Sequence, residues 1–238
     1  MEITLSLEKT NSKDISIMVD AFRASTSITI ALDKFEEVIP TFTPEEAKKI
    51  AKEKKGILAG ERMGKALKGF DLGNSPVEIN NLNTNIKNLI LTTSNGTRIL
   101  KDMKSTILIG CFINAKAVAE KSLHIAKENN YTHIDVVMAG WKGNFAIEDF
   151  LASGEILYWI QEEFDEKYSD EKFNISEYAQ SAILASRNYK EAKEIVYNTK
   201  SSNRLKKLGY EKDIEFSLRK NISQNVAIYD KGALKLYK

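Results

Sequence analysis

One pattern recurs along the first two-thirds of the chain and constrains its fold more than any other feature. A short run of β-branched and other apolar residues ends in a polar cluster, and the clusters lead into helical or glycine-containing segments. Short apolar runs do not separate a strand from a buried helix by periodicity alone, but the length and flanks of these runs favour strands. The predicted strands are residues 15–19, 57–59, 89–91, 107–109 and 134–138.

Helical periodicity follows two of these strands. From Ala115 onward the apolar residues recur on one face, with Asn114 as a plausible N-cap, and a second helix is predicted to begin at Ile147. Gly154 lies on the apolar face of that second helix, where a glycine costs roughly 1 kcal/mol in helix propensity. We therefore expect Gly154 to pack closely against a neighbouring element. Alternating strands and helices predict an α/β fold with helices on both faces of the sheet.

The two ends of the chain are predicted to add strands of a different kind. Residues 1–7 form one short candidate strand, and residues 225–238 suggest a hairpin that turns around Asp230, Lys231 and Gly232. A hairpin is antiparallel, so we expect a mixed sheet rather than a purely parallel one. No linker-like stretch, internal repeat or low-complexity tract divides the sequence, which favours a single domain over residues 1–238.

Composition excludes several classes of protein. The 35 basic and 33 acidic residues give a net charge of +2, which argues against an obligate nucleic-acid or polybasic membrane binder. A single cysteine, Cys111, excludes an internal disulfide and a cysteine-built zinc site, and two histidines are too few for a histidine-rich di-metal hydrolase. The longest apolar run, residues 107–113, is too short to cross a bilayer, and no secretion signal is visible. We expect a cytoplasmic protein; a homo-oligomer remains open.

Polar residues gather where the predicted strands end, which is where open α/β sheets bind ligands. Helix N-termini at these positions favour anions, whereas carboxylates beside them would repel an anion unless a cation bridges the two. Mg²⁺ is the natural bridge, because it prefers oxygen ligands. The residues therefore suggest Mg²⁺-assisted chemistry on a phosphorylated or otherwise polyanionic small molecule. The polar residues at the strand ends are Asp20, Arg23, Glu61, Arg62, Lys68, Asp71, residues 92–98, Asn114, Lys142, Asn144, Glu148 and Asp149.

Familiar phosphate motifs are absent, and simpler explanations exist for several of these residues. GERMGK at 60–65 has three residues between its glycines and lacks the following Ser or Thr, so it is not a P-loop, and no G-x-G-x-x-G occurs. Asp20 lacks a second aspartate two residues on, and Cys111 lacks the arginine of a cysteine phosphatase. Asp20 is also explained as a helix cap, and Glu148 and Asp149 as acids favoured by a helix dipole.

Taken together, five segments resemble the 2-phosphosulfolactate phosphatase family, Mg²⁺-dependent enzymes of coenzyme M biosynthesis. The resemblance implies a three-layer α/β/α fold with a mixed, largely parallel sheet, and hydrolysis of 2-phosphosulfolactate to 3-sulfolactate and phosphate. It places the site-bearing segments within about residues 15–160. The matching segments are VDAFRASTSI (19–28), GERMGKALKGFDLGNSP (60–76), LTTSNGTR (91–98), GCFINAKAVA (110–119) and AGWKGNFAIEDFLASGEI (139–156).

The chain departs from the family pattern in its C-terminal third. Ser202 and Asn203 stand about where the family carries His-Gly, and the cysteine often found shortly after the position of Asp213 is absent. This departure puts the substrate in question more than the type of reaction.

Both the residues and the resemblance suggest a mechanism of direct attack by water. Asp20, with Glu61 or Asp149, is expected to hold Mg²⁺ against the phosphate, and Glu148 or Asp149 is expected to position or deprotonate the water. Arginines are expected to bind the acid groups of a small polyanionic substrate, assisted by hydroxyls and backbone N–H groups. The predicted substrate-binding residues are Arg23, Ser25, Thr26, Arg62, Lys68, Ser94, Asn95, Gly96, Thr97, Arg98 and Asn114.

Two alternatives remain at this point. The first is a phosphatase for another small phosphorylated acid, which substrate profiling would separate from a sulfonate-specific enzyme. The second is a non-catalytic protein that binds anionic metabolites. Carboxylates argue against this second alternative, because a pure anion binder has little reason to place acids beside its arginines.

Overall fold

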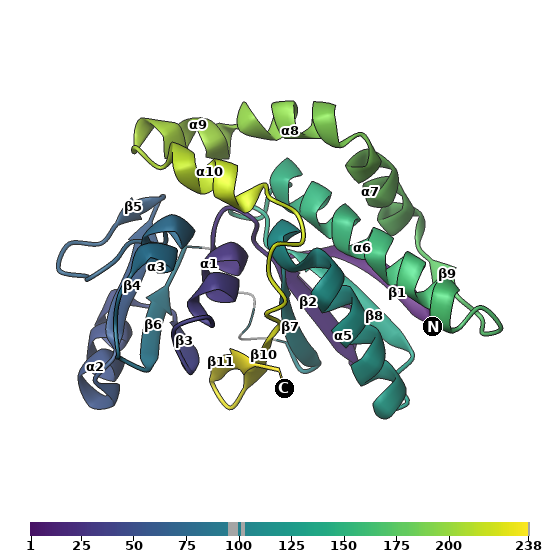
Figure 1. Ribbon diagram of the computed structural model, residues 1–238, viewed down its shortest axis with the longest axis horizontal. Coiled ribbons are helices and arrows are strands. Elements are labelled where there is room, and N and C mark those ends of the chain that lie inside the picture. Colours follow the sequence, from purple (N-terminus) through teal and green to yellow (C-terminus); the bar gives the residue numbers. More distant parts are fainter. Residues whose placement is uncertain (95–99, 101–102, 238) are drawn as a thin grey trace.

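A computed structural model describes residues 1–94, 100 and 103–237 of the chain (Figure 1). The strands are β1 (Glu2–Leu7), β2 (Ile15–Val19), β3 (Glu37–Thr41), β4 (Ile57–Arg62), β5 (Lys65–Ala66), β6 (Asn88–Thr92), β7 (Thr106–Gly110), β8 (His133–Met138), β9 (Asn174–Ile175), β10 (Ala227–Asp230) and β11 (Ala233–Leu236). The helices are α1 (Ala24–Ala31), α2 (Pro44–Lys54), α3 (Pro76–Asn81), the 3-10 turn η1 (Phe112–Asn114), α5 (Ala115–Glu128), α6 (Ile147–Lys167), α7 (Glu177–Arg187), α8 (Tyr189–Tyr197), α9 (Lys200–Lys207) and α10 (Glu211–Ser217).

The strands form an 11-stranded sheet in the order β5-β4-β6-β3-β11-β10-β7-β2-β8-β1-β9. Two parallel groups, β4-β6-β3 and β7-β2-β8-β1, are joined by the antiparallel hairpin β10–β11 of the C-terminus. On one side of the hairpin Ala227 pairs with Ile109, and on the other Leu234 pairs with Val38. The predicted hairpin and the mixed, largely parallel sheet are confirmed.

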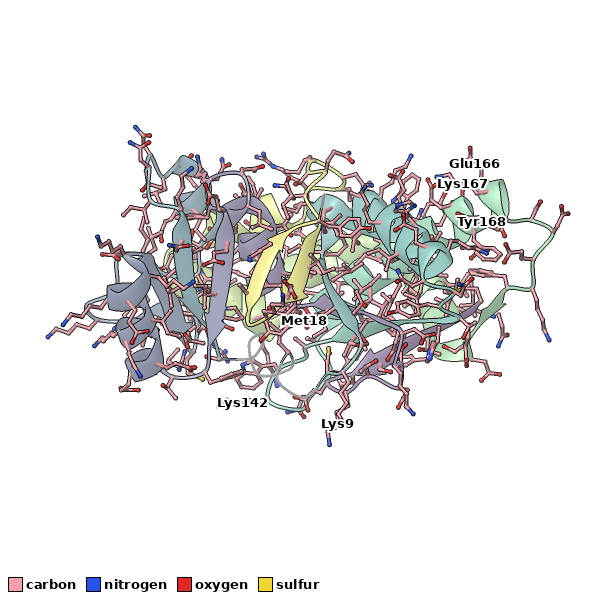
Figure 2. All side chains as sticks on the ribbon, turned by 90° about the horizontal axis from the view of Figure 1, so that it is seen from below. Lys9, Met18, Lys142, Glu166, Lys167 and Tyr168 are labelled. Atoms are coloured by element: carbon pink, nitrogen blue, oxygen red, sulfur yellow. The ribbon has the colours of Figure 1, made fainter. Side chains whose placement is uncertain are left out.

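Helices cover both faces of the sheet, which confirms the three-layer α/β/α arrangement. Alternation along β2 shows why: Ile15, Ile17 and Val19 face the core under α5 and α6, whereas Met18 faces the core under α1. Figure 2 shows Met18 inside the molecule, while Lys142 projects from its rim. Helix α2 packs on β3, β4 and β6 around a small separate core. The sheet is therefore buried on both sides, as its nearly continuous apolar strands require.

The predicted elements are present with small shifts in their ends. Each of the five predicted strands exists, and the helices beginning at Ala115 and Ile147 begin at those residues. Gly154 does pack closely: a Cβ there would lie 2.1 Å from the backbone oxygen of Ala182 on α7. The sequence pattern did not predict β3 and α2. β3 contains Pro40, and α2 buries only alanines, so neither shows a strong apolar signal.

The last four helices form a layer of their own. Figure 1 shows α7, α8, α9 and α10 in an arch from the β9 edge of the sheet toward β5 and α3. Helix α7 packs on α6, and α10 packs on α3 and α9. Among the described residues, no helix has both the length and the apolar character needed to cross a membrane. The arch brings C-terminal residues to the end of the sheet where the polar clusters lie.

Candidate active site

A pocket opens at the carboxyl ends of the parallel strands. Asp20 follows β2, Glu61 lies at the end of β4, Ser94 follows β6 and Trp141 follows β8. The helix α9 closes the pocket from the other side with Arg204. The cavity volume is about 50 Å³. The other lining residues are Phe22, Arg23, Met63, Gly64, Asn74, Thr93, Ser201 and Leu205.

Four buried carboxylates surround the base of this pocket. Asp20, Glu61, Glu148 and Asp149 are each less than a tenth exposed. Asp20 and Glu61 line the pocket itself, and Asp20 Oδ1 accepts a hydrogen bond from the backbone N–H of Ala24 at 3.3 Å. Asp20 thus binds the first N–H of α1, although the N-cap residue of that helix is Arg23. Asp20 also lies in the pocket, so this contact and a function in the pocket are compatible.

Backbone N–H groups hold both carboxylate oxygens of Glu61. Glu61 accepts hydrogen bonds from the N–H groups of Ser94 at 2.7 Å and Gly64 at 2.5 Å. These bonds tie the end of β4 to the loop after β6 and to the turn after β4. A carboxylate in this arrangement shapes the pocket wall while its negative charge still acts on the pocket.

Asp149 joins the strand ends of β2 and β8 from the first turn of α6. Its Oδ1 accepts from Ala21 N–H at 2.8 Å, and its Oδ2 accepts from Gly140 N–H at 2.9 Å. Asp149 does not line the pocket. Its place is behind Asp20, where it fixes the backbone on which Asp20 is carried.

Burial raises the pKa values of Asp20, Glu148 and Asp149, and repulsion between neighbouring carboxylates adds to the effect at the two aspartates. Burial, followed by the charge of Glu61, raises the pKa of Asp20 to about 7. Burial also raises the pKa of Glu148, which a hydrogen bond from Ser201 partly offsets. Burial and the charges of Asp20 and Glu148 raise the pKa of Asp149 well above its usual range. The site therefore carries more negative charge than its surroundings compensate.

Arg23 is a buried cation in the pocket lining, and its charge is already paired. Its Nη1 lies 2.7 Å from Asp213 Oδ2 on α10, and both side chains are 2% exposed. Its Nη2 donates to the backbone oxygen of Gly64 at 2.8 Å, and its guanidinium stacks on the ring of Tyr210. Ser75, the N-cap of α3, donates to the other oxygen of Asp213 at 2.6 Å. This pair locks the C-terminal arch onto the pocket.

Three of the predicted substrate-binding residues lie inside the fold, away from the pocket lining. Ser25 Oγ accepts from Asp20 N–H and donates to the Met18 carbonyl, and Thr26 Oγ1 donates to the Ala21 carbonyl. Asn114 accepts from Cys111 N–H and donates to backbone carbonyls. The structure gives these side chains backbone partners and does not bring them to the pocket.

Two predicted cations also lie outside the pocket lining. Arg62 donates to the backbone oxygens of Glu61 and Phe42 and to the hydroxyl of Thr92. Lys68 is exposed in the loop after β5. Ser94 does line the pocket, and its Oγ accepts from Met63 N–H at 3.2 Å. The predicted residues Asn95, Gly96, Thr97 and Arg98 lie outside the described residues.

The pocket also contains residues that the sequence analysis did not select. Asn74 belongs to the quoted segment 60–76 but was given no function, whereas Ser201 and Arg204 lie beyond the expected range 15–160. Asp213, which does not line the pocket but pairs with Arg23, also lies beyond that range. Ser201 and Arg204 flank the Ser202–Asn203 departure, which was the available signal. That range was therefore too narrow, because the C-terminal arch folds back over the strand ends.

The donor set can be compared with the needs of Mg²⁺. The ion prefers oxygen ligands and is commonly bound through one or two carboxylates together with substrate phosphates. Asp20 and Glu61 meet that need, and the buried Oδ1 of Asn74 has no hydrogen-bond partner among the described residues. Within the same residues, no group of three or more His, Cys, Asp or Glu side chains is disposed to hold a metal. The residues fit a cation held by two carboxylates and completed by substrate.

A sheet with carboxylates and arginines at its strand ends is suited to the hydrolysis of phosphoric monoesters. Comparison with known proteins places the chain in the same class, the phosphoric monoester hydrolases. The chain belongs to the 2-phosphosulpholactate phosphatase family, whose model matches residues 2–232.

Two archaeal relatives and one clostridial relative illustrate the similarity. The 2-phosphosulfolactate phosphatase of Methanothermobacter thermautotrophicus is 42% identical over 99% of this chain and 96% of its own length. The enzyme of the same name from Methanocaldococcus jannaschii is 34% identical over 94% and 92% of the two chains. A probable 2-phosphosulfolactate phosphatase of Clostridium acetobutylicum is 36% identical over 95% and 94%.

Proposed function

We propose that the protein hydrolyses 2-phosphosulfolactate to 3-sulfolactate and phosphate with the help of Mg²⁺. The observation that carries the proposal is the meeting of Asp20 and Glu61 with arginines in one pocket, in a chain similar along its length to proteins named for this reaction. A substrate with phosphate, carboxylate and sulfonate groups would account for the two arginines, Arg23 and Arg204, in the described lining of the pocket.

Asp20 and Glu61 are the proposed ligands of the ion. When bound, Mg²⁺ supplies positive charge against the phosphoryl oxygens. Asp149 supports this arrangement from behind, because its two oxygens hold the N–H groups of Ala21 and Gly140. Its effect would be to keep Asp20 in place.

Glu148 is the proposed base for the attacking water. It is 4% exposed, next to the pocket, and Ser201 donates a hydrogen bond to it. Asp149 is less suited, because both of its oxygens already accept backbone hydrogen bonds. A raised pKa suits a group that takes a proton near neutral pH. Glu148 would orient the water through its carboxylate and accept its proton as the water oxygen bonds to phosphorus. The bond between phosphorus and the ester oxygen would break, and that oxygen would take up a proton and leave as the hydroxyl of 3-sulfolactate.

Direct attack by water is favoured over a covalent intermediate. The hydroxyls of Ser25 and Thr26 bond to the backbone inside the fold. Cys111 is fully buried, and burial raises the pKa of its thiol to about 11. Thiols with such a pKa are poor nucleophiles near neutral pH.

A second candidate is a phosphatase for another small phosphorylated acid. The observation that favours it is the position of Ser202 and Asn203, because their neighbours Ser201 and Arg204 line the pocket. A change at this point of the chain would alter contacts with the non-reacting part of a substrate. The reaction and the carboxylates would stay the same.

The test is release of phosphate from 2-phosphosulfolactate, 2-phospholactate and an aryl phosphate. Each is assayed with Mg²⁺, with EDTA, and with Mg²⁺ restored. We expect metal-dependent release with a strong preference for the sulfonated ester. Preference for another ester would support the second candidate, and undiminished release in EDTA would refute the Mg²⁺ proposal. No release from any ester by folded protein would support a binding function instead.

A further inference from the structure

Arg204 stands out among the pocket residues because of the element that carries it. It lies on α9, in the C-terminal arch, whereas Asp20 and Glu61 lie at strand ends. Figure 1 shows α9 at the end of the arch near β5. The residue is half-buried and lines the same pocket as Asp20. A substrate in the pocket would therefore meet strand-end groups on one side and Arg204 on the other.

The other arginines described near the pocket have their terminal nitrogens occupied. Arg23 donates to Asp213 and to the Gly64 carbonyl, and Arg62 donates to two backbone oxygens and a threonine hydroxyl. Across the part of the chain that the structure describes, the Arg204 guanidinium has no hydrogen bond and no ion pair with another side chain. Its planar set of N–H donors is available to a ligand.

Packing on two sides orients Arg204 in advance. Its guanidinium carbon lies 4.6 Å from the centre of the Trp141 ring. The side chain also lies against the turn after β4, where a Cβ added to Gly64 would be 3.7 Å from Arg204 Cδ. Stacking on an aromatic ring uses the face of the guanidinium and leaves its N–H groups free at the edge. The ordering cost of binding an anion is correspondingly small.

Carboxylates and sulfonates present the oxygen pairs that an arginine fork binds. The phosphoryl group would occupy the side of the pocket formed by Asp20 and Glu61, because the proposed cation is held there. We propose that Arg204 is a specificity-determining residue that binds the non-reacting acid group of the substrate, its carboxylate or its sulfonate. This inference rests on the proposed function.

The test measures binding of three probes to the intact protein with Mg²⁺ present: 3-sulfolactate, lactate and inorganic phosphate. A charge-assisted hydrogen bond contributes about 1.5–3 kcal/mol, so Arg204→Ala should weaken 3-sulfolactate binding by roughly 10- to 100-fold. Phosphate binding should change less than about two-fold, since that probe lacks the second acid group. A parallel loss for lactate would identify the carboxylate, and an unchanged lactate affinity would identify the sulfonate.

Lys207→Ala is the matched control, because Lys207 is an exposed cation on the same helix and does not line the pocket. Arg204→Gln serves if the alanine variant does not fold. Equal losses for phosphate and 3-sulfolactate, or no loss for either, would overturn the inference. Turnover by the wild-type protein separates the two proposals. If the wild type releases no phosphate, the proposed function fails; if it does and Arg204→Ala binds normally, only the inference about Arg204 fails.

Discussion

The buried ion pair between Arg23 and Asp213 offers the sharpest test of how the fold supports the site. Asp213→Asn removes one charge from a pair in which both side chains are 2% exposed. The asparagine keeps the shape and can still accept one hydrogen bond. It removes the ion-pair partner of the buried Arg23 guanidinium, which keeps the Gly64 carbonyl and the Tyr210 ring as contacts.

The size of the effect follows from this burial. Removing one partner of a buried pair costs about 3–5 kcal/mol, because the remaining charge is left uncompensated in a poorly solvated place. Each 1 kcal/mol lowers the melting temperature of a chain of this length by roughly 2–4 °C. Asp213→Asn should therefore lower the melting temperature by about 6–20 °C. The hydroxyl of Ser75 also bonds Asp213, so the N-terminus of α3 should loosen with it.

Thermal and urea unfolding followed by circular dichroism measure this effect. Glu36→Gln is the matched control, since the Glu36–Lys87 pair is more than half exposed and should cost less than about 1 kcal/mol. The double variant Arg23→Met with Asp213→Leu should recover most of the lost stability, because it removes both charges of the buried pair. A cost for Asp213→Asn no larger than that of Glu36→Gln would refute the reasoning.

Three further outcomes are expected. Gly154→Ala should destabilise the fold by about 1–3 kcal/mol in urea unfolding, because the added Cβ would meet the Ala182 carbonyl, although alanine is the better helix former. Glu166→Ala, on the exposed face of α6, is the control. A Gly154→Ala variant more stable than the wild type would contradict the close packing. Glu148→Gln should lower kcat by roughly 10²- to 10⁴-fold with little change in KM, and a kcat within about five-fold of the wild type would exclude it as the base. In EDTA, the free energy of unfolding should fall as pH rises between about 4 and 7. Burial raises the folded-state pKa of Asp20 from 3.8 to about 7, so in this range the folded protein retains a proton that the unfolded chain loses. Asp20→Asn should make that slope shallower in melting experiments across this range, and an unchanged slope would show that Asp20 does not titrate this way.

The local sequence pattern predicted the strands β2, β4, β6 and β8, whose ends carry residues of the pocket. The runs at 15–19 and 134–138 are strands because their β-branched and apolar residues suit a sheet buried on both faces. Once such strands are parallel, their carboxyl ends meet at one edge, so the polar residues that follow them must come together. This holds for β2 and β8, but Asp20 and Glu61 follow strands of the two different parallel groups. Three antiparallel pairings separate these groups, so the groups run in opposite directions, and only the tertiary structure brings Asp20 and Glu61 into one pocket.

Other features depend on contacts between distant parts of the chain. The partner of Arg23 lies 190 residues away, and Ser201 and Arg204 reach the pocket only because the C-terminal arch folds back over it. No periodicity encodes such contacts, since they follow from packing whole elements together.

The composition and the spacing of its apolar runs determined that this chain forms a layered α/β sheet with carboxylates at its strand ends. Only the tertiary structure decided which polar side chains face the pocket and which pair inside the fold. The physical reason is that a buried polar group must find a partner, and distant segments supply many of those partners. Ser25, Thr26 and Asn114 donate hydrogen bonds to backbone oxygens, whereas the N–H groups of Arg204 are available to a ligand in the pocket.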